Sequence, residues 1–208
     1  GKSSLLNRLT DADVLAYDKL FATLDSTTRK FELPEGREIT LTDTVGFIKK
    51  LPTTLVEAFK STLDEITGAD LILHVVDASS DEFEDQIVAV NEVLEQIGAQ
   101  ALPQILVFNK CDVLSEERQA QLRTEYGALT VSANTGKGID ELIERIAQMA
   151  AAQDDQVDVL IPYQRGDLVS KAHERCLIVS EEHTEDGTHI SMMVPKAFAS
   201  DFEAFRAE

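Results

Sequence analysis

The residues best suited to chemistry begin the sequence, where Gly1-Lys2-Ser3-Ser4 precedes the helix-forming run LLNRL. In a phosphate-binding loop, backbone N–H groups and a helix N-terminus hold phosphate oxygens. A lysine such as Lys2 reaches the outer two phosphates, and a hydroxyl such as that of Ser3 ligates Mg²⁺. Four residues by themselves fit a capped helix equally well. The stretch therefore predicts a phosphate site only if other parts of the chain support it.

A second candidate stands at the end of a predicted strand. Asp43-Thr44-Val45-Gly46 follows the run REITLT. The Asp43 carboxylate can hold a metal-bound water, and the N–H of a flexible glycine such as Gly46 can approach a terminal phosphate. The pattern D-x-x-G is common, however, and usually marks only a turn.

Two further motifs bear on the base of a nucleotide. NKCD (109–112) follows the strand-like run QILVF, and SAN (132–134) ends another apolar run. The carboxylate of Asp112 can accept both the N1–H and the N2–H of guanine, a pair of donors that adenine lacks. Asn109 would tie neighbouring loops together and the stem of Lys110 would stack over the base.

The order of these motifs makes a joint interpretation possible. Each stands at the carboxyl end of a predicted strand or at the start of a helix, where open α/β sheets bind ligands. In this interpretation the N–H of Ala133 donates to guanine O6. The chain is therefore interpreted as a GTPase that binds GTP or GDP with Mg²⁺. The expected nucleotide-binding residues in these motifs are Gly1, Lys2, Ser3, Ser4, Asp43, Gly46, Asn109, Lys110, Asp112, Ser132, Ala133 and Asn134.

Composition argues against several other functions. Among 208 residues, 38 are acidic and 19 basic, which gives a net charge of −19. This balance disfavours broad electrostatic binding to DNA, RNA or anionic membranes, although it leaves room for a local basic patch. No apolar run approaches the ~20 residues of a membrane helix, and Cys111 and Cys176 lack metal-site spacing. We expect a cytoplasmic protein and, because the chain begins inside a motif without Met, a fragment that lacks the start of its phosphate loop.

The elements that must position these residues follow from the apolar pattern. Runs at 71–78, 104–110 and 128–133 are apolar on both faces, which predicts buried parallel strands with His74 as a core residue rather than a catalyst. Amphipathic helices are predicted at 51–66, 81–98 and 138–151. The fold class is thus α/β, a mostly parallel sheet.

Two segments depart from this alternation. Residues 26–43 predict an antiparallel hairpin at one edge of the sheet, turning at Pro-Glu-Gly. After a linker at 153–156, residues 157–208 predict a small βαββα unit of the ferredoxin-like α+β type. We therefore expect a nucleotide-binding domain at 1–152 and a C-terminal domain at 157–208.

The stretches LFATLDSTTRK, LTDTVGFIKKLP, LVEAFKSTLDEI, LILHVVDAS and NKCD resemble the HflX family of GTPases, within the wider class that includes Era, Obg and TrmE. The resemblance covers residues 1–152, and more weakly it extends to the family's C-terminal domain. It implies a P-loop GTPase fold and a switch threonine that ligates Mg²⁺, which FATLD places on Thr23. Thr27 and Thr28 are the competing candidates. The expected metal ligands are then Ser3, Thr23 and Asp43.

The family resemblance also bears on hydrolysis. Ras-like enzymes place a Gln just after D-x-x-G to orient the attacking water, and here that position is Phe47. A phenyl ring cannot position water, so no catalytic side chain is assigned. We expect the chain by itself to hydrolyse GTP slowly and a partner to complete the catalytic site. Phe47 is equally well explained as a core anchor of the switch, and both roles can hold.

The resemblance implies a ribosomal partner, chiefly the large subunit, and a role in splitting or rescuing stalled ribosomes under stress. A monomer is expected. An alternative function is a nucleotide-gated binding module with incidental hydrolysis, and a third possibility is a chain that binds no nucleotide because half its phosphate cradle is missing. Candidate contacts, each also explicable as solvated surface charge, are Lys49, Lys50, Lys60, Arg165, Lys171 and Arg175.

Overall fold

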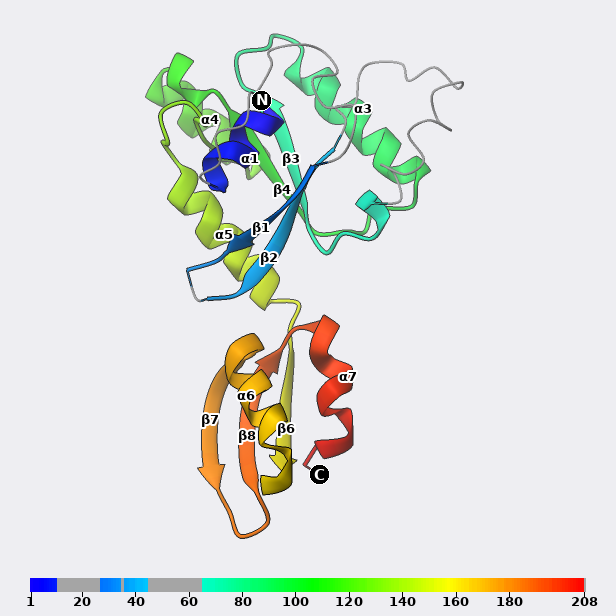
Figure 1. The fold of residues 1–208 in the computed structure, drawn as a ribbon. Helices are drawn as coiled ribbons and strands as arrows, with labels where there is room; N and C mark the ends of the chain where they lie inside the picture. Colours follow the sequence, from blue (N-terminus) through cyan, green and yellow to red (C-terminus); the bar gives the residue numbers. More distant parts are fainter. Residues whose placement is uncertain (11–26, 35, 45–64, 208) are drawn as a thin grey trace. The chain divides into compact units, whose positions relative to one another are not determined.

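The computed structural model in Figure 1 describes residues 1–10, 27–34, 36–44 and 65–207. It divides into two compact units. The first comprises Gly1–Leu33 and Glu38–Arg145, and the second comprises Pro34–Arg37 and Ile146–Glu208. Each unit has its own sheet and its own buried apolar side chains.

A parallel sheet forms the centre of the first unit. Its strands are β3 (Ile72–Asp77), β4 (Gln104–Asn109) and β5 (Leu129–Thr130), in the order β3-β4-β5. The predicted buried parallel strands are thus confirmed, and the α/β fold class with them. The middle strand is the most deeply buried, with Val107 and Phe108 fully inaccessible. The register pairs Asp77 with Asn109, so the carboxyl ends of β3 and β4 lie side by side.

Besides a helical turn at 65–67, four helices of the described residues follow or precede these strands (Figure 1). They are α1 (Lys2–Leu9), α3 (Phe83–Gln96), α4 (Glu116–Tyr126) and α5 (Ile139–Ala151). The predicted helices at 81–98 and 138–151 contain α3 and α5. Most of the helix predicted at 51–66 lies outside the described residues.

Helix α4 was missed by the sequence analysis. Its sequence EERQAQLRTEY is polar, and only Gln119 and Leu122 are buried, so it has almost no apolar periodicity. Its signals are at its ends instead. The Ser115 hydroxyl accepts a hydrogen bond from the Arg118 N–H, and Gly127 ends the helix at a φ of 60°.

Aromatic packing joins α3, α4 and the sheet. The rings of Phe83, Phe108 and Tyr126 meet edge to face, with centroids 5.3 to 5.8 Å apart. Such pairs contribute beyond the area they bury. They hold α3 and α4 against β4, the strand that leads into the NKCD motif.

Strands β1 (Thr27–Glu32) and β2 (Glu38–Asp43) form the predicted antiparallel hairpin. Within the described part of the chain this hairpin is a separate two-stranded sheet and not an edge of the parallel one. Its last register pair is Thr27 with Asp43. The hairpin thus delivers Asp43 at the end of β2.

The second unit has the predicted βαββα order. Its elements are β6 (Asp155–Ile161), α6 (Gly166–Arg175), β7 (Leu177–His183), β8 (Thr188–Val194) and α7 (Ala199–Phe202), with short 3₁₀ turns at Tyr163–Arg165, Lys196–Phe198 and Glu203–Phe205. The antiparallel sheet has the order β6-β8-β7.

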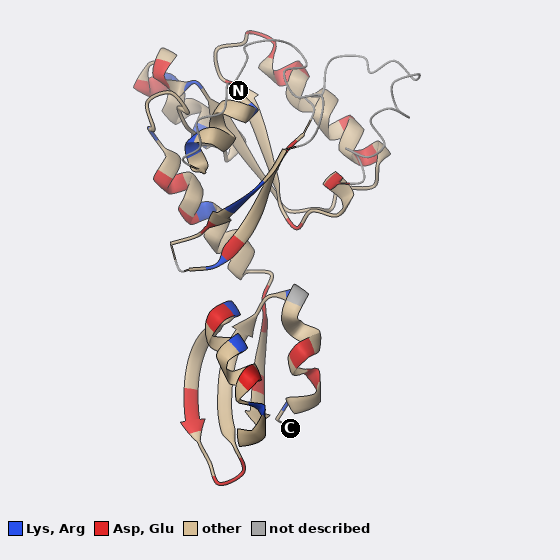
Figure 2. Ribbon diagram, viewed as in Figure 1, with Lys and Arg blue, Asp and Glu red and all other residues tan. Residues whose placement is uncertain are grey.

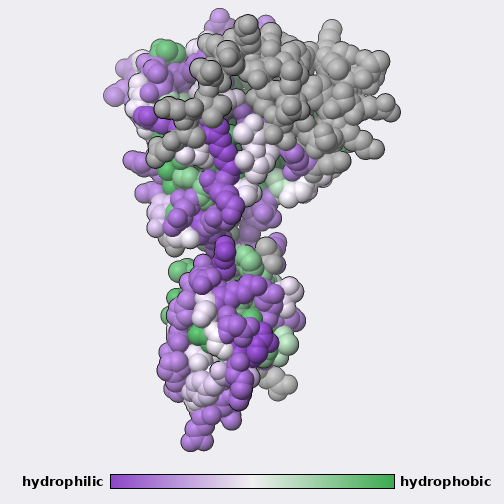
Figure 3. Space-filling view, in the orientation of Figure 1, coloured by the Kyte–Doolittle hydropathy of each residue, from purple (hydrophilic) through white to green (hydrophobic). Residues whose placement is uncertain are grey.

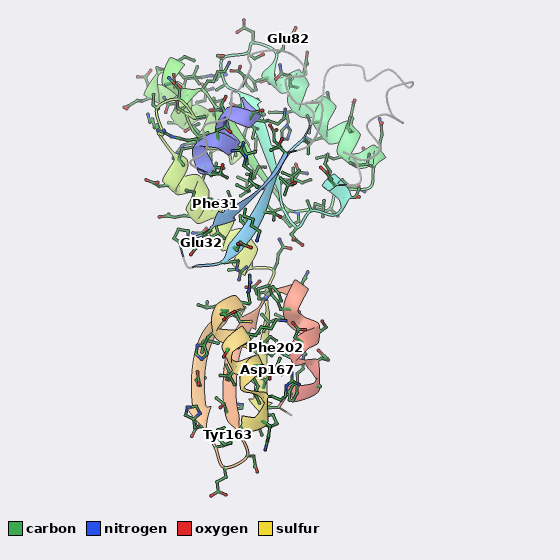
Figure 4. All side chains as sticks on the ribbon, in the orientation of Figure 1. Phe31, Glu32, Glu82, Tyr163, Asp167 and Phe202 are labelled. Carbon is green, nitrogen blue, oxygen red and sulfur yellow. The ribbon has the colours of Figure 1, made fainter. Side chains whose placement is uncertain are left out.

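The core of the second unit lies on one face of this sheet. Val159, Ile190 and Met192 are fully buried, and Phe202 of α7 packs with them (Figure 4). The central strand β8 is buried along most of its length, whereas the edge strand β7 is mostly exposed. None of the helices in the described residues has the length and apolarity needed to cross a bilayer.

His74 provides a test of packing in the first unit. It lies in β3, and burial lowers its pKa from 6.5 to about 4. Between these pH values the unfolded chain binds a proton that the folded chain excludes, so the free energy of unfolding falls as the pH drops from 6.5 towards 4. We expect the free energy of unfolding to fall by on the order of 3 kcal/mol over this pH range. In His74→Leu this contribution to the pH dependence should be absent. Native-state hydrogen exchange of the β4 amides measures it, and equal pH dependence in both proteins would contradict the expectation.

Candidate functional site

The residues expected to lie near phosphate and metal come from two segments forty residues apart. The Ser3 Oγ donates a hydrogen bond of 2.5 Å to Asp43 Oδ2. Helix α1 supplies the hydroxyl in its first turn, and β2 supplies a carboxylate whose residue is only 6% exposed. A hydroxyl and a carboxylate are the oxygen donors that Mg²⁺ prefers. These two residues therefore fit the metal ligands expected from the sequence.

Lys2 lies beside this pair in a half-buried position. Burial lowers the pKa of its amine, and the neighbouring Asp43 carboxylate partly opposes that effect. An anion bound next to Lys2 would favour its charged form further. The electrostatic surroundings thus suit a phosphate at this position.

Asn109 connects the segments expected to contact phosphate and base. It ends β4 and is 2% exposed. Its Nδ2 donates to the Gly1 carbonyl at 3.2 Å, and its Oδ1 accepts from the N–H groups of Lys110 at 2.8 Å and Ala133 at 3.0 Å. One buried amide therefore holds three loops (Figure 1 shows the N-terminus close to β3 and β4). The Ala133 N–H, expected to donate to guanine O6, would have to be shared with Asn109.

A hydrogen bond from a buried serine fixes the orientation of the Asp112 carboxylate. The fully buried Ser132 donates through Oγ to Asp112 Oδ1 at 2.5 Å. The rest of the Asp112 residue is exposed, so its carboxylate can meet a ligand. The same Ser132 Oγ accepts from the Thr135 N–H at 3.1 Å, which fixes the loop after β5.

Two residues that the sequence analysis did not single out support the NKCD turn. The buried Gln119 of α4 donates from Nε2 to the carbonyls of Cys111 at 2.8 Å and Leu114 at 3.0 Å. Asp77, at the end of β3, forms an ion pair with Lys110 at 2.7 Å. Asp77 could have been found from its place at a strand end, whereas Gln119 lies in the helix that was missed.

The remaining predicted residues are distributed as follows. Ser4 is half-buried in α1, and Asn134 is exposed in the loop after Ala133. Thr23, Gly46 and Phe47 lie outside the described residues. Within the described part of the chain, no group of three or more His, Cys, Asp or Glu side chains could hold a metal by itself.

Two family models match the chain. The model described as a 50S ribosome-binding GTPase matches residues 1–110, and the model of the HflX C-terminal domain matches residues 117–203. The first match lies almost wholly in the first unit, whereas the second begins in the first unit and runs through most of the second.

Curated relatives agree with these models. A protein named GTPase HflX from Akkermansia muciniphila is 43% identical over 100% of this chain and 49% of its own length. The GTPase HflX of Escherichia coli K12 is 42% identical over 93% of this chain and 46% of its own length. The chain thus spans about half the length of these relatives.

Solved structures share the fold. The crystal structure of SsGBP with GDP superposes with a TM-score of 0.58 at 25% identity, over 73% of this chain and 47% of that one. Era in complex with MgGDPNP and a segment of 16S ribosomal RNA has a TM-score of 0.55 at 23% identity, over 72% of this chain and 52% of that one. The likeness to Era concerns the fold alone.

Removal of the Asn109 amide tests the linkage of the three loops. Asn109→Ala leaves the N–H groups of Lys110 and Ala133 without their acceptor, so we expect the free energy of unfolding to fall by about 2 to 4 kcal/mol. Asn134→Ala, at an exposed position, should change it by less than about 0.5 kcal/mol. Urea unfolding of both variants measures the difference, and equal midpoints would show that the amide does not hold the loops.

Proposed function

The chain belongs to the HflX family of GTPases, and from this premise we propose that it binds guanine nucleotides with Mg²⁺ and hydrolyses GTP. The observation that carries the proposal is the hydrogen-bonded path from Gly1 through Asn109 to Ala133. This path joins a helix N-terminus suited to phosphates with the loop that would receive a base.

At the phosphate end, the N-terminal amides of α1 and the Lys2 ammonium would neutralise the phosphate charge. Ser3 and Asp43 would hold Mg²⁺, which supplies further charge neutralisation when bound. Family resemblance adds Thr23 to these ligands. The Ser3 hydroxyl lies 2.5 Å from the Asp43 carboxylate, so the two oxygen donors stand side by side.

At the base end, Asp112 would select guanine. Its carboxylate accepts the N1–H and N2–H donors together, and Ser132 orients it from the buried side. A site built to pair with two donors strongly rejects a base that lacks them, because its own polar groups would be left unpaired. Adenine nucleotides should therefore bind poorly.

Hydrolysis would proceed by positioning and charge neutralisation. The transferred phosphoryl group needs little covalent help from the protein, so Lys2 and the loop amides can supply much of the stabilisation. Phe47 follows the D-x-x-G glycine and offers no group to orient water. We therefore propose slow intrinsic turnover, at or below ~10⁻⁴ to 10⁻³ s⁻¹, with a partner completing the site.

We propose that this partner is the ribosome, chiefly its large subunit. The chain would act in the cytoplasm and take part in splitting or rescuing stalled ribosomes under stress. The description of the matching family model supports a ribosomal partner. The net charge of −19 gives no general affinity for RNA. In the second unit, Figure 2 shows Asp and Glu on β7 and α7 and both signs of charge on α6, and the described surface on the face drawn in Figure 3 is largely hydrophilic.

The basic candidates in the second unit already have neighbours. Arg165 pairs with Asp167 at 2.8 Å and Lys171 with Asp201 at 2.5 Å. The Arg175 guanidinium lies 5.9 Å from the ring centre of Phe198. A ribosomal contact through them would replace these interactions, whereas Lys49, Lys50 and Lys60 lie outside the described residues.

Equilibrium binding of a fluorescent GDP in the presence of Mg²⁺ tests the site. We expect displacement by GTP and GDP and no displacement by ATP. In Asp112→Asn the amide would oppose the N2–H donor of guanine, so preference should move to xanthosine nucleotides by at least about 100-fold. Unchanged guanine selectivity in that variant would contradict the assignment of Asp112. Absence of GDP binding by the folded wild-type chain would contradict the proposal as a whole.

Sedimentation with purified large ribosomal subunits tests the partner. We expect more of the chain to pellet with a non-hydrolysable GTP analogue than with GDP, by at least about fivefold, because in GTPases generally the terminal phosphate orders the loops that contact a partner. GTP hydrolysis should accelerate when subunits are added. If the chain acted fully on ribosomes with the non-hydrolysable analogue alone, the result would favour the alternative function, a nucleotide-gated binding module in which hydrolysis is incidental. Equal pelleting with both nucleotides would contradict a switch.

A further inference from the structure

Asp77 stands where β3 ends, directly beside the end of β4 that leads into the NKCD turn. One carboxylate oxygen, Oδ2, pairs with the Lys110 ammonium at 2.7 Å. The other, Oδ1, accepts from the N–H and the hydroxyl of Ser79 at 3.0 and 2.6 Å. Both oxygens are thus engaged, and the carboxylate has a defined orientation.

The charge of Asp77 persists at neutral pH. Partial burial raises the pKa of this carboxyl group, but the hydrogen bonds from Lys110 and Ser79 outweigh that effect and hold its pKa below the usual value. The ammonium therefore meets an anion and not a neutral acid.

Lys110 is constrained at its other end by its backbone. Its φ of 65° and ψ of 32° are left-handed, and it is the single non-glycine residue with a positive φ in the described ranges. A lysine rarely adopts this conformation unless its surroundings require it. Here its N–H donates to Asn109, and Gln119 holds the carbonyl of the next residue, Cys111. The lysine stem is thus held between a fixed backbone and a fixed carboxylate.

The ion pair has little to do for stability. The side chains of Lys110 and Asp77 are 41% and 36% exposed, and pairs this exposed contribute little to the free energy of unfolding. The ion pair should therefore act mainly by restricting the rotamers of the Lys110 side chain. A long side chain loses rotamer freedom when it packs against a ligand, and a stem already held at both ends has less freedom left to lose.

We propose that Asp77 is a positioning residue of the nucleotide site, which anchors the Lys110 ammonium so that the lysine stem forms a preformed platform for the face of the purine ring. The inference rests on the proposed function and extends it. Apolar stacking does not distinguish one purine from another, so Asp77 governs affinity whereas Asp112 governs the choice of base. The two carboxylates therefore have separable roles.

The test is the affinity of the 208-residue chain carrying Asp77→Asn for fluorescent GDP, with urea unfolding measured on the same protein. Asparagine keeps the size of the side chain and an oxygen for Ser79 but loses the charge. We expect the dissociation constant to rise about 2- to 5-fold, the largest effect that an ion pair of this exposure can have on the freedom of the lysine stem. The unfolding midpoint and the preference for GDP over xanthosine diphosphate should stay unchanged.

Two further variants sharpen the result. Asp81→Asn removes an exposed acid four residues away that takes no part in this ion pair, and it should bind GDP like wild type. Lys110→Met keeps an unbranched stem without the ammonium, so adding Asp77→Asn to it should have no further effect. An effect of Asp77→Asn that persists in the Lys110→Met background would mean that Asp77 acts by another route, and would overturn the proposal.

The remaining outcomes separate this inference from the proposed function. Wild-type protein that binds GDP together with an unchanged Asp77→Asn overturns the inference and leaves the function intact. Tighter binding by Asp77→Asn also overturns it, because the ion pair would then withhold Lys110 from the base. Wild-type protein that binds no GDP overturns both.

Discussion

The buried side-chain amide of Asn109 is the interaction on which the rest of the site depends. Its three hydrogen bonds reach the start of α1, the NKCD turn and the loop after β5. An amide can do this because it carries donors and an acceptor on one rigid plane. Because Asn109 is only 2% exposed, bulk solvent has little access to replace a lost partner, so loss of this amide would weaken all three loops.

The parallel sheet gives that amide its position. Strand β4 is buried on both faces, and the aromatic contacts of Phe108 with Phe83 and Tyr126 hold α3 and α4 against it. Because parallel strands end at one edge of the sheet, the polar residues at or just after the ends of β3, β4 and β5 lie close together although they are far apart in the sequence. Asp77, Asn109 and Ser132 are the product of that convergence.

Different kinds of sequence signal were informative to different degrees. Strands such as 104–109 could be predicted because a continuous apolar run has few alternatives. The motifs proposed to bind phosphate and base stand out in the sequence because few residue types suit that chemistry. Helix α4 could not be predicted from periodicity, since its buried positions are Leu122 and the polar Gln119. Gln119 donates to two backbone carbonyls, a role that depends on a turn eight residues away closing onto it.

The sequence by itself determined the α/β class, the βαββα order of the C-terminal residues and the resemblance to the HflX family, and it supplied the motifs proposed for phosphate and base, because each depends on residue type and local order. Only the tertiary structure decided which side chains interact with one another. It joined Ser3 to Asp43, placed Ala133 against Asn109, and paired Lys110 with Asp77. These contacts link residues distant in the chain, and the packing of the strands and helices between them sets which side chains come within hydrogen-bonding distance.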